Sequence, residues 1–190
     1  MVSPVLYRQY VDAAWRAFRN TGHTPSADTI LIGELAPEGD GPVSPEQPIP
    51  PMDFPRALYC VDASNRPLAG SAATSLACPA NAVRLSFAQG HPGLFDATGF
   101  GHHPYSFFLA PNVSYPEPDF VPSVDLSRLE HGLDATFHTY GGGRRIPIYL
   151  TEYGYETNPP DPFGESASRG RRGISARPYT WPGRTLGFEP

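Results

Sequence analysis

The residue with the clearest chemical potential is Glu152, which follows directly after a run of apolar residues. That run, Ile146–Leu150, is apolar at consecutive positions, which is typical of a strand buried on both faces of a parallel sheet. Tyr153 and Tyr155 follow the carboxylate closely. Parallel α/β proteins place their sites at the C-terminal ends of strands, so a carboxylate in this setting is a candidate nucleophile.

Glu152 also has a purely structural interpretation. Arg144 and Arg145 precede the same strand and carry the opposite charge. A salt bridge from Glu152 to either arginine would explain the carboxylate without any chemistry. The elements around the strand must decide between the two interpretations.

Two further strand-like runs also end in residues that bear functional groups. The run over Thr29–Gly33 is short and apolar, and a carboxylate follows it. The run over Phe100–Ser106 carries two histidines and a tyrosine towards its C-terminal end. The candidate side chains at these two ends are Glu34, His102, His103 and Tyr105.

Helical patterns separate these strands. A helix is predicted over Val5–Arg19, after Ser3 and Pro4, which suit a helix start. Its predicted apolar face consists of Leu6, Tyr10, Ala13, Ala14, Ala17 and Phe18. A short helix is predicted over Phe54–Cys60, and a longer one begins at Ser123 or Asp125 and ends before Gly141. Strands that alternate with helices predict a parallel α/β fold.

The composition excludes several classes of partner. The chain has 190 residues, a net charge of −5 and only 14 basic side chains, all of them arginines, which argues against a nucleic-acid partner. No apolar run approaches the roughly 20 residues that span a bilayer, and no signal peptide is recognisable, so no membrane partner is expected. The 24 prolines and 19 glycines, beside 39% hydrophobic residues, predict a packed domain with long loops.

Cys60 and Cys78 are the two cysteines of the chain, and they flank a short polar segment. A disulfide between them would suit an exported protein, and two free thiols are the alternative. No further cysteine or histidine cluster surrounds them, so no metal site is expected.

Four motifs give the chain a resemblance to a known family. They are Thr29–Pro37, Pro51–Asp62, Gly101–Ser106 and Ile146–Phe163. In this order they resemble the retaining glycoside hydrolases of the (β/α)8-barrel clan that includes cellulases and β-xylosidases, nearest to an actinobacterial cellulase-like branch. The resemblance implies an α/β fold, an incomplete (β/α)8 (TIM) barrel that covers strands five to seven and helices four to six.

The resemblance also implies an activity, the hydrolysis of O-glycosidic bonds in β-linked glycans by a retaining mechanism. Glu152 matches the catalytic nucleophile at the end of strand seven. His103 and Tyr105 match a site that contacts sugar or orients the nucleophile. The side chains expected to bind the carbohydrate substrate are Glu34, His102, His103, Tyr105, Tyr153 and Tyr155. The family uses no metal and no organic cofactor.

Two departures limit this activity. The proton donor of the clan lies in an Asn-Glu-Pro motif, which this sequence lacks, and the chain begins at what resembles helix four. A retaining glycosidase needs both carboxyl groups. The chain is therefore expected to be inactive alone, although Glu34 remains an alternative acid. A non-catalytic carbohydrate-binding or structural half-barrel is the competing interpretation.

The resemblance divides the chain into a partial hydrolase barrel over residues 1–163 and a tail over residues 164–190. The tail is rich in Arg, Gly, Ser and Pro and is expected to be disordered. We interpret it as the product of a frameshift, because another reading frame permits a hydrolase-like continuation. Intact relatives are expected to be secreted.

Overall fold

Three short strands form a parallel sheet in the order β1-β2-β3. They are β1 (Leu31–Leu35), β2 (Gly99–His102) and β3 (Ile148–Leu150). The computed structural model describes residues 4–39, 48–79, 84–107 and 109–155. Since all three strands run in one direction, their C-terminal ends meet at the same edge of the sheet.

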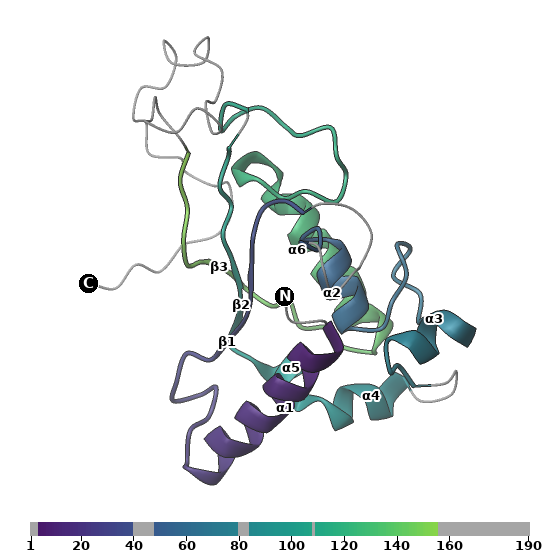
Figure 1. Cartoon of the computed structure of the whole chain (residues 1–190). Helices are drawn as coiled ribbons and strands as arrows, with labels where there is room; N and C mark the ends of the chain where they lie inside the picture. Colours follow the sequence, from purple (N-terminus) through teal and green to yellow (C-terminus); the bar gives the residue numbers. More distant parts are fainter. Residues whose placement is uncertain (1–3, 40–47, 80–83, 108, 156–190) are drawn as a thin grey trace.

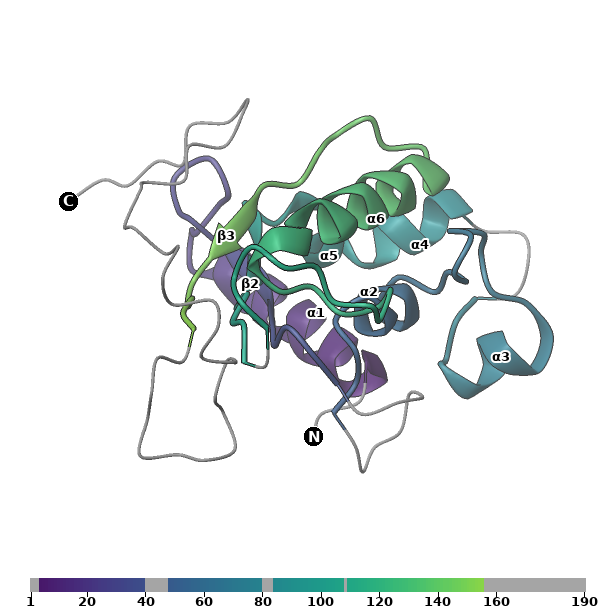
Figure 2. The ribbon, with the colours of Figure 1, turned by 90° about the horizontal axis from the view of Figure 1, so that it is seen from above.

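Helices gather on one side of this sheet, as two perpendicular views show (Figures 1 and 2). The helices are α1 (Pro4–Asn20), α2 (Asp53–Leu58), α3 (Gly70–Ser75), α4 (Arg84–Gly90), α5 (Pro92–Asp96), the 3-10 turn η1 (Ser123–Asp125) and α6 (Leu126–Thr139). The sequence patterns identified α1, α2 and α6, whereas α3, α4 and α5 were not predicted. These three are only five to seven residues long, too short to develop a helical period; α2, with six residues, is equally short, but Pro55 near its start indicated it.

The two faces of the sheet differ in what covers them. On β2, Phe100 and His102 are fully buried and point towards the core. The alternate positions are Gly99 and Gly101, where an added Cβ would meet the Tyr149 ring and the Glu34 carboxylate. Successive residues of a strand point to opposite faces, so the side of the sheet away from the core carries the Glu34 side chain.

The prediction of an incomplete (β/α)8 barrel is wrong. The sheet formed by the described residues is open, and β1 and β3 are its two edges. All three residues of β3 are half-buried, so this strand is not covered on both faces as its apolar composition predicted. An apolar run indicates that a strand is packed against other side chains, but it does not show whether one face or both faces are covered.

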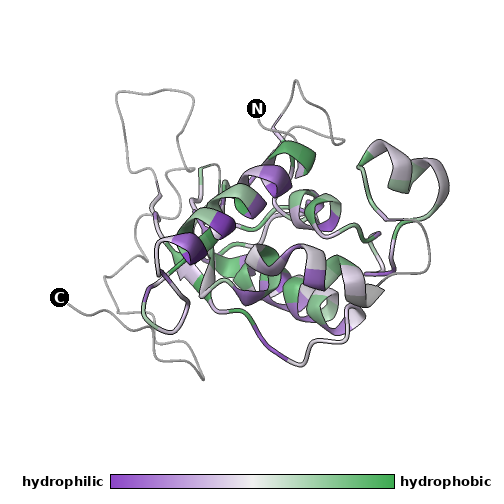
Figure 3. Ribbon diagram, turned by 90° about the horizontal axis from the view of Figure 1, so that it is seen from below, coloured by the Kyte–Doolittle hydropathy of each residue, from purple (hydrophilic) through white to green (hydrophobic). Residues whose placement is uncertain are grey.

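The apolar face predicted for α1 is also wrong. Leu6, Tyr10 and Phe18 are 46%, 62% and 40% exposed. The helix instead buries Pro4, Arg8, Val11 and Trp15. Hydrophobic and hydrophilic residues alternate along this helix (Figure 3), and its contacts with α2 and α5 select the buried set. On α5, a Cβ at Gly93 would meet Val11 and Trp15, so the two helices approach closely there.

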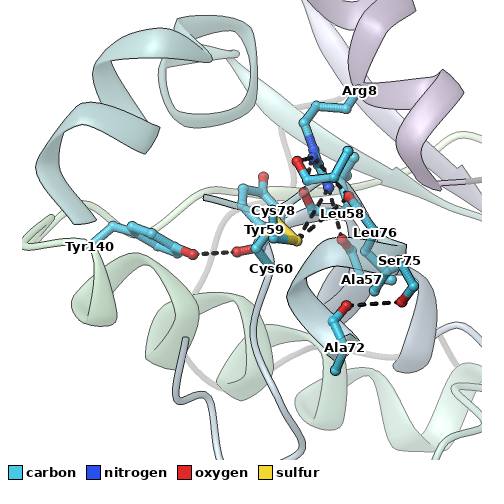
Figure 4. Close-up of a disulfide and its surroundings, with 11 residues drawn as sticks. Arg8, Ala57, Leu58, Tyr59, Cys60, Ala72, Ser75, Leu76, Cys78 and Tyr140 are labelled. Atoms are coloured by element: carbon cyan, nitrogen blue, oxygen red, sulfur yellow. Dashed lines mark hydrogen bonds between the residues drawn. A yellow bond between two sulfur atoms is a disulfide. The ribbon is translucent and has the colours of Figure 1, made fainter. Parts of the chain in front are cut away.

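A disulfide and a buried arginine join the same two segments of the chain (Figure 4). Cys60 and Cys78 are bonded, which settles the question that their spacing left open. The guanidinium of Arg8 donates to four backbone carbonyls, those of Ala57, Leu58, Leu76 and Ala77. The disulfide thus joins the end of α2 directly to the segment after α3, and Arg8 of α1 bridges the same two segments through its hydrogen bonds.

Some expectations fall outside the described part of the chain. The predicted tail over residues 164–190 and the domain boundary at residue 163 are among them. Within residues 4–155, gaps excepted, no helix has both the length and the apolar character needed to cross a lipid bilayer.

Candidate functional site

A distorted end of β1 positions the first functional side chain. The pairing of β1 with β2 shifts register between Gly33 and Leu35, which is a bulge at Glu34. Glu34 has a φ of 61°, a left-handed conformation that a glutamate rarely adopts. The hydroxyl of Tyr7 on α1 accepts a hydrogen bond of 2.6 Å from the Gly33 N–H. Bulges of this kind redirect a side chain, and strained residues cluster at functional sites.

The Glu34 carboxylate crosses β2 and contacts the ends of both other strands. It passes over Gly101, where no Cβ obstructs it. Its Oε2 lies 2.6 Å from Nε2 of His103, which follows β2. The same oxygen accepts a hydrogen bond of 2.6 Å from the Thr151 hydroxyl, one residue beyond β3. One carboxylate from β1 therefore links the C-terminal ends of β2 and β3.

Glu152 lies at the same edge of the sheet with its side chain directed to solvent. The Tyr105 hydroxyl donates a hydrogen bond of 3.1 Å to Glu152 Oε2. Nδ1 of His103 is 3.8 Å from the same oxygen, so the imidazole lies between the two carboxylates. The hydrogen bond to Glu152 raises the pKa of Tyr105, because it favours the protonated phenol. Tyr105 therefore remains a donor.

The salt-bridge interpretation of Glu152 is wrong. Arg144 donates to the backbone carbonyls of Phe95 and Ala97 on the opposite end of the sheet. Arg145 pairs with Asp134 of α6 at 3.3 Å. Neither arginine reaches Glu152, whose side chain is 57% exposed.

Aromatic residues occur on both segments that lead away from the strand ends near Glu152. Tyr105 stacks against Phe107, with ring centroids 5.5 Å apart and planes only 11° from parallel. Tyr153 is 72% exposed and Tyr155 is 42% exposed. A bridge between Ser106 and Tyr155 extends the pairing of the two segments beyond the strands. Exposed aromatic faces beside a carboxylate provide an amphipathic binding surface.

His102 lies apart from the other candidate residues. Its side chain is fully buried, and Nε2 lies 2.7 Å from the Val121 carbonyl. Its pKa is lowered to about 4, chiefly by burial; the hydrogen bond to Val121 opposes this decrease, and the nearby His103 adds to it. A fully buried imidazole cannot contact a substrate, so the expectation that His102 binds the carbohydrate is wrong. Its contact with the Val121 carbonyl instead attaches the loop at Val121 to the core.

The sequence interpretation missed three residues that build this site. Thr151 directly precedes Glu152 and is the first polar residue after β3, which was a usable signal. Gly101 and Tyr7 gave no such signal, because their roles depend on contacts between separate elements.

Within the described residues, neither a metal-binding group nor the depression between α2 and α6 forms part of the site. In the described ranges no group of three His, Cys, Asp or Glu side chains is arranged to hold a metal ion. A depression of about 310 Å³ lies between α2 and α6, lined among others by Met52, Arg56 and His131. It contains none of the side chains at the strand ends.

The arrangement offers two carboxylates on either side of an imidazole, with tyrosine and threonine hydroxyls as donors. Such a cluster can attack an electrophilic carbon through the exposed carboxylate or bind hydroxyl groups of a ligand. No family model matches the chain, and no curated protein and no solved structure matches it. The geometry and the sequence motifs therefore carry any functional conclusion.

Proposed function

We propose that the strand-end cluster is the nucleophile side of a retaining glycosidase site for β-linked glycans, with Glu152 as the nucleophile. The observation that carries this proposal is the placement of Glu152. Its carboxylate is exposed at the C-terminal end of β3 and accepts the hydrogen bond of Tyr105. An ionised, accessible and oriented carboxylate is what attack on an anomeric carbon requires.

The remaining residues serve substrate binding. The rings of Tyr153 and Tyr155 present apolar faces to solvent, and sugars pack their C–H faces against such rings. Glu34 and His103 pair with each other at the same strand ends, and we assign their remaining polar atoms to the hydroxyl groups of the sugar. The partner is a carbohydrate.

A second carboxyl group is needed to protonate the leaving oxygen, about 5 Å from the nucleophile. The sequence has no Asn-Glu-Pro motif, and Oε2 of Glu34 serves as a hydrogen-bond acceptor for Thr151. We therefore expect this chain alone to leave ordinary aryl β-glycosides intact. Turnover that the Glu152→Gln substitution abolishes would contradict this expectation and assign the acid role to Glu34.

A leaving group that needs no proton tests the nucleophile alone. The probes are 2,4-dinitrophenyl 2-deoxy-2-fluoro-β-glucoside and the matching xyloside. Glu152 forms a bond to the anomeric carbon, and dinitrophenolate departs with the bonding electron pair. The fluorine slows hydrolysis of the resulting ester, so the adduct is visible by mass spectrometry.

We expect one added sugar per chain, located on Glu152 by peptide mapping. Glu152→Gln abolishes the adduct, Tyr105→Phe slows its formation, and Glu117→Gln, on an exposed loop, leaves it unchanged. Absence of the adduct from the folded protein with both sugars would refute the proposal, as would equal labelling of Glu152→Gln.

A non-catalytic carbohydrate-binding module is the second candidate. The exposure of Tyr153 and Tyr155 favours it, because stacking surfaces bind sugars whether or not cleavage follows. Sugar-dependent quenching of tyrosine fluorescence without an adduct would support this candidate over the glycosidase.

A further inference from the structure

The Glu34 carboxylate contributes more than a polar surface, because its conformation has a cost that hydrogen bonding offsets. Its left-handed backbone is unfavourable for any residue with a Cβ, by about 1–2 kcal/mol. The bulge and the glycine at position 101 together direct its side chain across β2. The strained conformation brings one carboxylate oxygen within hydrogen-bond distance of both His103 and Thr151.

The contacts of that oxygen determine the direction of the hydrogen bonds. The Thr151 hydroxyl donates to Oε2, so the carboxylate is an acceptor. Nε2 of His103 lies 2.6 Å from the same oxygen, and two acceptors do not pair at that distance. Nε2 must therefore carry a hydrogen, and in the neutral ring Nδ1 is then an acceptor.

We infer that Glu34 is a positioning residue, which fixes the Nε2–H form of His103 and aims its Nδ1 at the space beside Glu152. Nδ1 is 3.8 Å from Glu152 Oε2, too far for a direct hydrogen bond. This leaves the acceptor free for a hydroxyl of a sugar whose anomeric carbon faces Glu152. The inference rests on the proposed function only in naming the sugar hydroxyl, since the tautomer is a property of the free protein.

The tautomer is measured directly by the ¹⁵N chemical shifts of the His103 ring at a pH where the ring is neutral. We expect the Nε2–H form in the natural protein. Glu34→Ala removes the acceptor and gives a mixture of both forms. Glu34→Gln retains an amide oxygen that accepts the same hydrogen, so it restores the Nε2–H form.

The matched control is Glu117→Ala, which removes an exposed carboxylate from the loop before η1 and leaves the tautomer unchanged. A purely structural role for Glu34 would lower thermal stability in Glu34→Ala without changing the tautomer, and that result would overturn the inference. An Nδ1–H form in the natural protein would overturn it as well.

The adduct assay separates this inference from the proposed function. If both hold, Glu34→Ala slows labelling of Glu152 by the fluoroglycosides at least tenfold, and Glu34→Gln recovers most of the rate. If the natural protein forms no adduct, the proposed function fails, whereas the tautomer measurement still decides the role of Glu34.

Discussion

His102 makes the stability of the fold depend on pH in a defined range. The imidazole is fully buried and its pKa is lowered from 6.5 to about 4, chiefly because burial removes the ring from water. Among the described residues Nδ1 makes no hydrogen bond of normal geometry, and the nearby Leu35 backbone and Glu34 offset the effect of burial only in part. The folded protein therefore holds this histidine neutral.

The sign of the effect follows from proton binding. Between pH 6.5 and about 4 the unfolded chain binds a proton at His102 that the folded chain does not accept. The contribution of His102 to the free energy of unfolding is therefore constant above pH 6.5 and falls as the pH decreases to about 4. Each pKa unit corresponds to about 1.4 kcal/mol, so the total loss is about 3 kcal/mol.

The assay compares the natural protein with His102→Gln by urea unfolding, followed by far-ultraviolet circular dichroism at several pH values from 7.5 to 4. The glutamine amide retains a donor for the Val121 carbonyl but does not titrate. Other groups with shifted pKa values, such as Asp28 and Asp62, are present in both proteins and cancel in the difference.

We expect the natural protein to lose about 3 kcal/mol relative to His102→Gln between pH 7.5 and 4. Parallel stability curves for the two proteins across this range would refute the reasoning, since His102 would then titrate alike in the folded and unfolded chains.

Two further predictions follow from the packing of α1 and the strain at β1. Tyr10→Ser should change the free energy of unfolding by less than about 0.5 kcal/mol, because Tyr10 is exposed. Trp15→Ala should lower it by about 3–5 kcal/mol, because it removes the side chain that packs against α5. Urea unfolding of both variants measures the difference, and equal losses would contradict the burial of Trp15 against α5. Glu34→Gly should be more stable than Glu34→Ala by about 0.5–1 kcal/mol, because only glycine adopts a φ of 61° without strain. Both variants lack the carboxylate, so the thermal unfolding midpoints isolate the backbone, and equal midpoints would argue against strain at this position.

Local sequence patterns predicted the longer helices and the strands that consist of a short apolar run. The helix over Pro4–Asn20 and the helix that ends at Thr139 have enough turns to show a period, and the structure contains both. The apolar runs ahead of Glu34 and Glu152 gave the two strands and their C-terminal carboxylates. The meeting of these ends at one edge followed from parallel pairing alone.

Packing decided which faces of these elements are buried. Along α1, aromatic and small apolar residues occupy two sides, and sequence spacing selected the side that contains Tyr10. The contacts with α2 and α5 bury the other side, which contains Val11 and Trp15. Arg8 is buried on that side as well, because its guanidinium donates hydrogen bonds to backbone carbonyls. Whether the sheet is open or closes into a barrel could not be predicted from the sequence either. An apolar strand indicates that its side chains are packed, but not how many strands lie beside it.

Residue order is enough to place acidic and aromatic side chains directly after the strands. It does not say which of two neighbouring histidines faces the solvent: in the folded chain His103 lies between Glu34 and Glu152, whereas His102 enters the core. Adjacent residues of an extended chain point to opposite faces, so the packing of the helices against one face of the sheet makes this choice.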